Sequence, residues 1–134
     1  ARQPTVIVDG AHNPAGAESL VAALDEAFAF QRVVGVIGVM GDKDAENILA
    51  TLEPALAEIV ITRAASDRSM EVDDLAEIAV DVFGEDRVHI RERLDDAVTL
   101  AGDLAGGRGG AWRGVIVTGS IFLVAEARVL FGRA

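Results

Sequence analysis

Apolar residues recur along this chain in two alternating patterns, as short β-branched runs and as longer stretches with helical spacing. The short runs predict strands, at Thr5–Val8, Arg32–Met40, Glu58–Thr62, Arg87–Ile90 and Gly114–Thr118. The longer stretches predict helices, at Ala15–Phe30, Ala45–Leu56, Val72–Phe83, Leu94–Ala105 and Ile121–Leu130. Strands that alternate with helices favour a mostly parallel sheet covered on both faces. We therefore expect one α/β domain over residues 1–134, a Rossmann-like three-layer α/β/α arrangement with five or six strands whose order the sequence does not indicate.

Composition narrows the classes of function. The chain has 134 residues, of which 51% are hydrophobic and 25% charged, as in a globular domain. Its net charge of −10 argues against a nucleic-acid surface, which needs clustered Lys and Arg. With no cysteine and two distant histidines, disulfides and a thiolate or histidine metal site are not expected. No signal peptide or long apolar span is seen, so we expect a cytoplasmic protein without a membrane partner.

The first predicted strand ends in a site-like stretch. It stops at Asp9-Gly10, and Asn13-Pro14 is typical of a helix cap followed by the first helical residue. A carboxylate, a flexible glycine and the imidazole of His12 thus lie between a strand and a helix. Ligands of open α/β sheets bind at such positions, and the helix N-terminus favours anions.

Two further turns join this stretch. In a parallel β/α sheet all strand-to-helix turns lie at one edge, which brings together Asp9–Asn13, Gly41–Asp44 and Thr118–Ser120. The combined groups are carboxylates, an imidazole, the ammonium of Lys43, which is the only lysine, and hydroxyls. Such groups can bind a polyanion with its counter-cation and a carboxylate substrate. They do not include a nucleophile paired with a base, as covalent catalysis would need.

Two nucleotide-binding motifs are missing from the sequence. Neither a GxxxxGK[ST] loop nor a GxGxxG fingerprint is present. On its own this domain should therefore be neither a nucleotide triphosphatase nor a dehydrogenase, and another domain would hold most of the phosphates of any nucleotide.

The stretch Asp9–Pro14, DGAHNP, resembles the motif that opens the C-terminal domain of folylpolyglutamate synthase and dihydrofolate synthase, members of the Mur ligase superfamily. Two more blocks agree in the right order, Gly38–Asp44 (GVMGDKD) and Thr118–Arg128 (TGSIFLVAEAR). The resemblance covers essentially the whole chain. It implies an ATP-dependent amide ligase whose central domain, outside this chain, carries the phosphate loop and the Mg²⁺ ligands.

The resemblance also implies a reaction. ATP phosphorylates the carboxylate of a folate, and the amine of L-glutamate attacks the acyl phosphate. The C-terminal domain closes over that site, excludes water, and contributes to ATP and glutamate binding. Whether dihydropteroate is a second substrate depends on a pterin pocket outside this chain.

Four residues have candidate roles in this reaction, two of them through the resemblance and two through their chemistry, and each has a plainer alternative. Asp9 resembles the acid that contacts the nucleotide ribose, or it bonds its own turn. His12 resembles the imidazole at the γ-phosphate and incoming glutamate, or it is a solvated loop residue. Lys43 pairs with the glutamate carboxylate or neutralises transition-state charge, or it is a solvated turn lysine. Ser120 bonds the glutamate carboxylate, or it only caps the last helix.

Other residues and other functions are also open at this stage. Arg63, Arg68 and Ser69 follow the third strand on the same edge and could border the adenine, whereas His89 is expected to be structural. One rival function is a Mur-type ligase that adds amino acids to a peptidoglycan precursor. Another is a non-catalytic α/β binding or receiver module, which normally has paired acids at the first strand and a lysine after the last.

Overall fold

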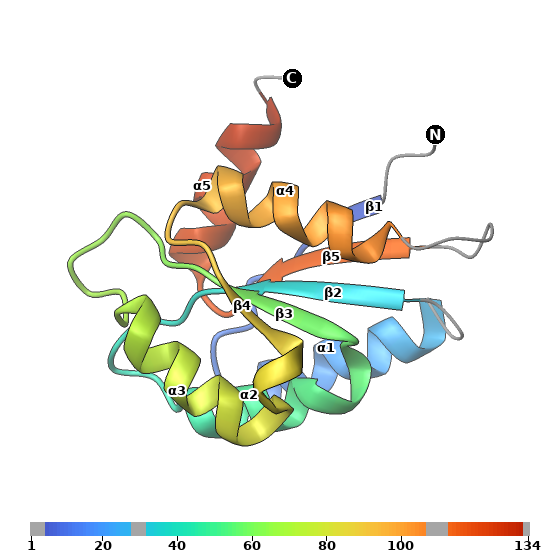
Figure 1. Ribbon diagram of the computed structural model, residues 1–134, viewed down its shortest axis with the longest axis horizontal. Helices are drawn as coiled ribbons and strands as arrows, with labels where there is room; N and C mark the ends of the chain where they lie inside the picture. Colours follow the sequence, from blue (N-terminus) through green and yellow to red (C-terminus); the bar gives the residue numbers. More distant parts are fainter. Residues whose placement is uncertain (1–4, 28–31, 107–112, 133–134) are drawn as a thin grey trace.

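A five-stranded sheet forms the middle layer of the computed structural model, which describes residues 5–27, 32–106 and 113–132 (Figure 1). Its strands are all parallel and lie in the order β1-β5-β2-β3-β4. Their bounds are Thr5–Val8 for β1, Arg32–Ile37 for β2, Glu58–Ile61 for β3, Val88–Ile90 for β4 and Arg113–Thr118 for β5. The predicted α/β fold with a mostly parallel sheet is therefore confirmed.

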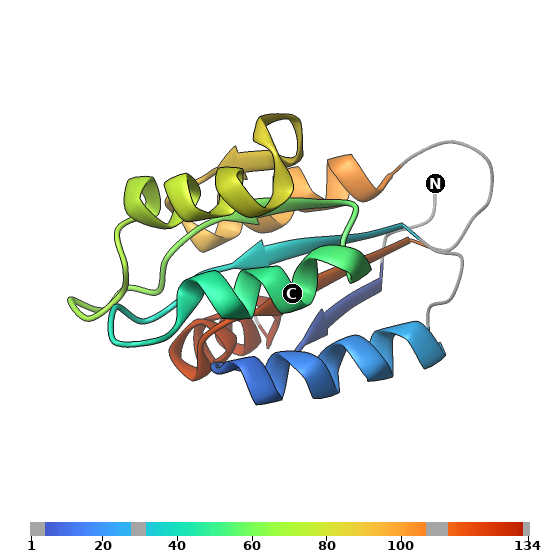
Figure 2. The same cartoon turned by 90° about the horizontal axis from the view of Figure 1, so that it is seen from below.

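Helices cover both faces of the sheet, as the two views show (Figures 1 and 2). One face carries α1 (Pro14–Ala27), α2 (Ala45–Leu52) and α3 (Val72–Phe83). The other carries α4 (Leu94–Ala105) and α5 (Ile121–Gly132). Each face has its own apolar core, because alternate side chains of a strand point to opposite sides of the sheet.

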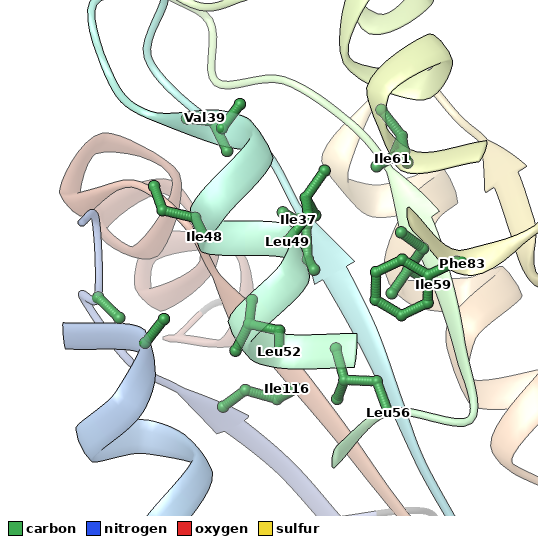
Figure 3. Packing of buried hydrophobic residues seen from close by; sticks show 14 of the residues in the cluster. Ile37, Val39, Ile48, Leu49, Leu52, Leu56, Ile59, Ile61, Phe83 and Ile116 are labelled. Atoms are coloured by element: carbon green, nitrogen blue, oxygen red, sulfur yellow. The ribbon is translucent and has the colours of Figure 1, made fainter. Parts of the chain in front are cut away.

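The larger core lies beneath α2. Ile48, Leu49 and Leu52 of this helix are fully buried against the central strands, as is Ile37 of β2 (Figure 3). Burying one such side chain contributes about 2 kcal/mol to folding. This packing fixes α2, and with it the turn that leads from β2 into α2.

Several element ends differ from the predicted ones for local reasons. β2 stops at Ile37, because Gly38 turns toward β5 and Met40 forms an isolated bridge with Ser69. α2 ends at Leu52, and a 3₁₀ turn over Glu53–Ala55 follows, because Pro54 cannot continue the helical hydrogen bonds.

Further along the chain, Arg87 is the last residue of a 3₁₀ turn, so β4 starts at Val88 and not at the predicted Arg87. α5 continues past the predicted Leu130 to Gly132. The predicted end of the first helix at Phe30 lies outside the described residues.

The strand order bears on the rival functions. A flavodoxin-like receiver has the order 2-1-3-4-5, with the first strand inside the sheet. Here β1 lies at an edge and β5 separates it from β2. The receiver interpretation is therefore wrong in topology. No helix in the described part of the chain is long and apolar enough to cross a membrane.

Candidate functional site

Three turns meet at the carboxyl edge of the sheet, because β5 lies between β1 and β2. We call Asp9–Asn13, Gly38–Asp44 and Thr118–Ser120 the ligand rim (left side of Figure 2). The amide of Gly119 donates to the carbonyl oxygen of Ala11 at 3.0 Å, and the amide of Gly38 donates to that of Thr118 at 3.4 Å. The predicted meeting of Asp9–Asn13 with Thr118–Ser120 is thus confirmed. The predicted Gly41–Asp44 turn lies at the same edge of the sheet, and the contact from this side is made by Gly38.

Gly119 is the contact point of the rim. Its φ is +104°, and a Cβ built on it would lie 2.5 Å from the carbonyl oxygen of Gly38. Only glycine permits this approach. The turn residues Gly10 and Gly41 adopt no such backbone conformation, because among the described glycines only Gly84 and Gly119 have a positive φ.

Asp9 and His12 each make one bond within their own turn. The Asp9 Oδ1 accepts a hydrogen bond from the amide of Ala11 at 2.9 Å. One carboxylate oxygen of Asp9 therefore bonds its own turn, which is the plainer of the two roles predicted for this residue. The His12 Nδ1 lies 2.9 Å from the carbonyl oxygen of Gly10. A carbonyl oxygen only accepts, so Nδ1 carries a proton and Nε2 is left for other interactions.

The start of α1 completes this part of the rim. The Asn13 Oδ1 accepts from the amide of Gly16 at 2.8 Å, which makes Asn13 the predicted cap, and no acidic residue lies in the first turn. A hollow of about 320 Å³ lies beside this helix start. Its lining residues are Asp9, Gly10, Ala11, His12, Asn13, Gly16, Ser19, Leu20 and Ala23. A small polar ligand fits such a volume.

Lys43 lies in the turn after β2, where its amide donates to the carbonyl oxygen of Met40 at 3.1 Å. Its Nζ is 4.0 Å from Asp42 Oδ2, and the Asp42 side chain is 78% exposed. An ion pair this long and this exposed contributes little to stability. The ammonium is therefore available to a ligand.

Ser120 caps α5. Its Oγ accepts from the amides of Phe122 at 3.1 Å and Leu123 at 3.4 Å, and the residue is 1% exposed. This is the plainer of its two predicted roles. Only the hydroxyl proton remains for a substrate carboxylate.

The loop after β3 holds two polar side chains that serve the loop itself. Arg63 pairs with Glu71 at 3.3 Å and donates to the carbonyl oxygen of Ser66 at 3.0 Å. Ser69 is 7% exposed and donates to the carbonyl oxygen of Ala64 at 3.0 Å. These partners make Arg63 and Ser69 structural, whereas Arg68 is exposed.

His89 lies away from the rim, as expected. It is on β4, and its Nε2 is 2.7 Å from Glu58 Oε1 on β3. The other Glu58 oxygen pairs with Arg32 on β2. The three side chains thus join neighbouring strands, which is a structural role.

A larger hollow, of about 780 Å³, lies on the α4–α5 side of the sheet. Glu126 of α5 accepts there from the amide of Ala65 at 2.7 Å, and Arg93 pairs with Asp95 at 2.9 Å. Those hydrogen bonds from the Arg93 guanidinium hold the pKa of the Asp95 carboxyl below its usual range. Because these charges already have partners, the hollow beside His12 is the better candidate site.

Comparison with known proteins identifies the family. The family described as "Mur ligase, glutamate ligase domain" matches residues 1–121. The chain belongs to this family. It is 42% identical over 139 residues to the dihydrofolate synthase/folylpolyglutamate synthase of Mycobacterium tuberculosis, covering 97% of this chain and 28% of that protein.

Solved structures of the family agree in fold. A Mycobacterium tuberculosis folylpolyglutamate synthase complexed with ADP and AMPPCP has a TM-score of 0.92 and 44% identity, covering 98% of this chain and 30% of that one. The Yersinia pestis bifunctional enzyme complexed with AMPPNP and Mn ion has a TM-score of 0.80 and 26% identity, covering 98% and 30%. The glutamate ligase domain described here thus spans less than a third of the length of these relatives.

Proposed function

We propose that this Mur ligase domain is the C-terminal domain of an ATP-dependent amide ligase that adds L-glutamate to folates through an acyl phosphate, with dihydropteroate as the second acceptor to be tested. The observation that supports the proposal is the ligand rim, where the turns that carry His12, Lys43 and Ser120 lie at one edge of the sheet and Gly119 contacts Ala11. An acyl phosphate has to be shielded from water, and a domain that presents such a rim can close over it.

The proposed nucleotide contacts come from Asp9 and His12. One Asp9 oxygen is engaged by Ala11, which leaves Oδ2 to accept from a ribose hydroxyl. His12 stands one residue before the cap of α1, where the helix terminus favours anions such as a γ-phosphate.

His12 is also the proposed catalytic group. Its Nδ1–H bond to Gly10 fixes the ring, so that Nε2 has a defined direction. As an imidazolium, Nε2 donates to the phosphate. As a neutral imidazole, it accepts a proton from the amine of the incoming glutamate.

Lys43 and Ser120 are the proposed substrate contacts. Lys43 holds a carboxylate of glutamate and offsets the negative charge that grows as the amine attacks. Ser120 donates its hydroxyl proton to a glutamate carboxylate while its oxygen keeps capping α5.

The remaining parts of the reaction are assigned to the rest of a longer protein. The sequence lacks a phosphate-binding loop, and the described residues contain no group of three side chains suited to a metal ion. We therefore assign the triphosphate and Mg²⁺ ligands to the central domain, with which this domain would form the complete site.

The test is glutamate ligation by the full-length protein, measured with tetrahydrofolate and labelled L-glutamate. The wild type should incorporate glutamate and release ADP and phosphate in equal amounts. His12→Ala should lower kcat/KM for glutamate on the order of 100-fold without loss of fold, because it removes a group that meets developing charge. His89→Ala, the matched control, should leave the rate unchanged.

Two outcomes would contradict the proposal. An unchanged rate in His12→Ala would remove this residue from the site. Ligation of an amino acid to a peptidoglycan precursor, with folates inert, would favour the rival ligase.

A further inference from the structure

The turns after β2 and β3 form one connected unit. Met40 and Ser69 make an antiparallel bridge, and the amide of Gly41 donates to the carbonyl oxygen of Arg68 at 2.7 Å. The amide of Met70 donates to the carbonyl oxygen of Val39 at 2.9 Å. The main chain of Arg68 therefore lies directly beside the turn that carries Lys43.

Arg68 combines a fixed main chain with an available cation. Its amide donates to Ser66 Oγ at 3.2 Å, and its carbonyl oxygen accepts from Gly41. Within residues 5–27, 32–106 and 113–132, its guanidinium makes no hydrogen bond or ion pair, and the residue is exposed. Arg63 in the same loop differs, because its guanidinium is held by Glu71 and Ser66.

The acidic residues of the two turns hold Lys43 only weakly and have no bond to the Arg68 guanidinium among the described residues. Asp44 is occupied as the cap of α2, where its oxygens accept from the amide and side chain of Asn47. Asp42 lies 4.0 Å from Lys43 and is largely exposed, and Asp67 is exposed. Lys43 and Arg68 are therefore carried by two turns that touch through their main chains, at one edge of a chain whose net charge is −10.

We propose that Arg68 and Lys43 together hold the two carboxylates of a dicarboxylic amino acid, so that Arg68 selects an acidic side chain. This inference rests on the proposed ligase function. An arginine fork binds a carboxylate through two parallel hydrogen bonds. A substrate amino acid with a neutral side chain would leave that guanidinium without its partner. This loss would let the protein discriminate between acidic and neutral amino acids.

The strand order assigns one carboxylate to each cation. Along the carboxyl edge of the sheet the turns follow the strand order: the turn after β1 carries His12, that after β5 carries Ser120, that after β2 carries Lys43, and that after β3 carries Arg68. The reacting amine shares a carbon with the α-carboxylate, so this end of the amino acid lies toward His12 and Lys43. The side-chain carboxylate, several bonds away, reaches Arg68.

The test compares L-glutamate with L-glutamine, which has the same length and a neutral end, in steady-state ligation by the full-length protein. Arg68→Gln should raise KM for glutamate at least about tenfold, since a hydrogen bond to a charged group is lost, and should change kcat by less than about twofold. KM for ATP and the kinetics with glutamine should not change. Arg68→Lys should fall between the wild type and Arg68→Gln.

Arg91→Gln is the matched control, because Arg91 is an exposed arginine that follows β4 at the same edge. It should behave as the wild type. An unchanged KM for glutamate in Arg68→Gln, or a rise in KM for ATP instead, would overturn the role of Arg68. A wild type that ligates no glutamate would instead overturn the proposed function, and the role of Arg68 with it.

Discussion

At the scale of single residues, the rim depends on backbone contacts as much as on charged groups. Gly119 brings the turn after β5 against both neighbours, through its bond to Ala11 and its close approach to Gly38. The side chains that would touch ligands, His12 and Lys43, are therefore positioned by a residue that has no side chain. A substitution at Gly119 should move the site without removing any reactive group.

Gly119→Ala tests this dependence. The new Cβ would lie 2.5 Å from the carbonyl oxygen of Gly38, so the turns must separate. We expect a loss of about 3 kcal/mol in the free energy of unfolding, measured with urea, from strain and lost contacts. Gly84→Ala is the control, because Gly84 also has a positive φ, of +89°, but nothing lies within 4 Å of its Cβ position.

In Gly84→Ala the free energy of unfolding should fall by only about 1 kcal/mol, because the substitution adds the cost of a positive φ at alanine but no steric clash. Equal losses in the two variants would show that the approach to Gly38 does not matter. In the full-length protein, Gly119→Ala should also reduce ligation, whereas Gly84→Ala should not.

At the scale of elements, local signals predicted helix starts better than strand ends. Asn13, Asp44 and Ser120 accept hydrogen bonds at the starts of their helices, as short polar side chains do. The apolar pattern extends the predicted strand to Met40, whereas β2 ends at Ile37, because the backbone of Gly38–Met40 turns toward β5 and β3. Such a departure depends on neighbours that are remote in sequence.

The start of α4 yields a prediction about pH. The Arg93 hydrogen bonds lower the pKa of Asp95, so the carboxylate form is favoured in the folded protein. The resulting stability is present above the pKa of an unfolded aspartate and is lost as the pH falls through the lower folded-state pKa.

An NMR titration of the Asp95 carboxyl should therefore give a midpoint below the usual aspartate range. In Arg93→Gln the midpoint should return toward that range, whereas Arg91→Gln should leave it unchanged. An identical midpoint in the wild type and Arg93→Gln would contradict the assignment of the cause.

At the scale of the whole molecule, the sequence predicted the layers and the shared edge but not the order of the strands. β5 pairs with both β1 and β2, and Val34 of β2 lies beside Val115 of β5. All five strands have similar apolar sequences, so the pattern contains no information on which of them pair. The shared edge was predictable because it needs only parallel strands.

Roles at the rim were less predictable than positions. Ser120 is buried as a cap, and Arg68 differs from Arg63 through partners that only the folded loop reveals. We propose that the glutamate ligase domain presents one side of a site whose other side belongs to the remaining part of a longer protein.

A crystal structure of the full-length protein with a non-hydrolysable ATP analogue and L-glutamate would test this requirement most directly. We predict that the ligand rim faces the nucleotide, with His12 Nε2 within hydrogen-bond distance of the terminal phosphate or the glutamate amine and Lys43 Nζ against a glutamate carboxylate. A structure with both ligands bound and the rim turned to solvent would contradict the account.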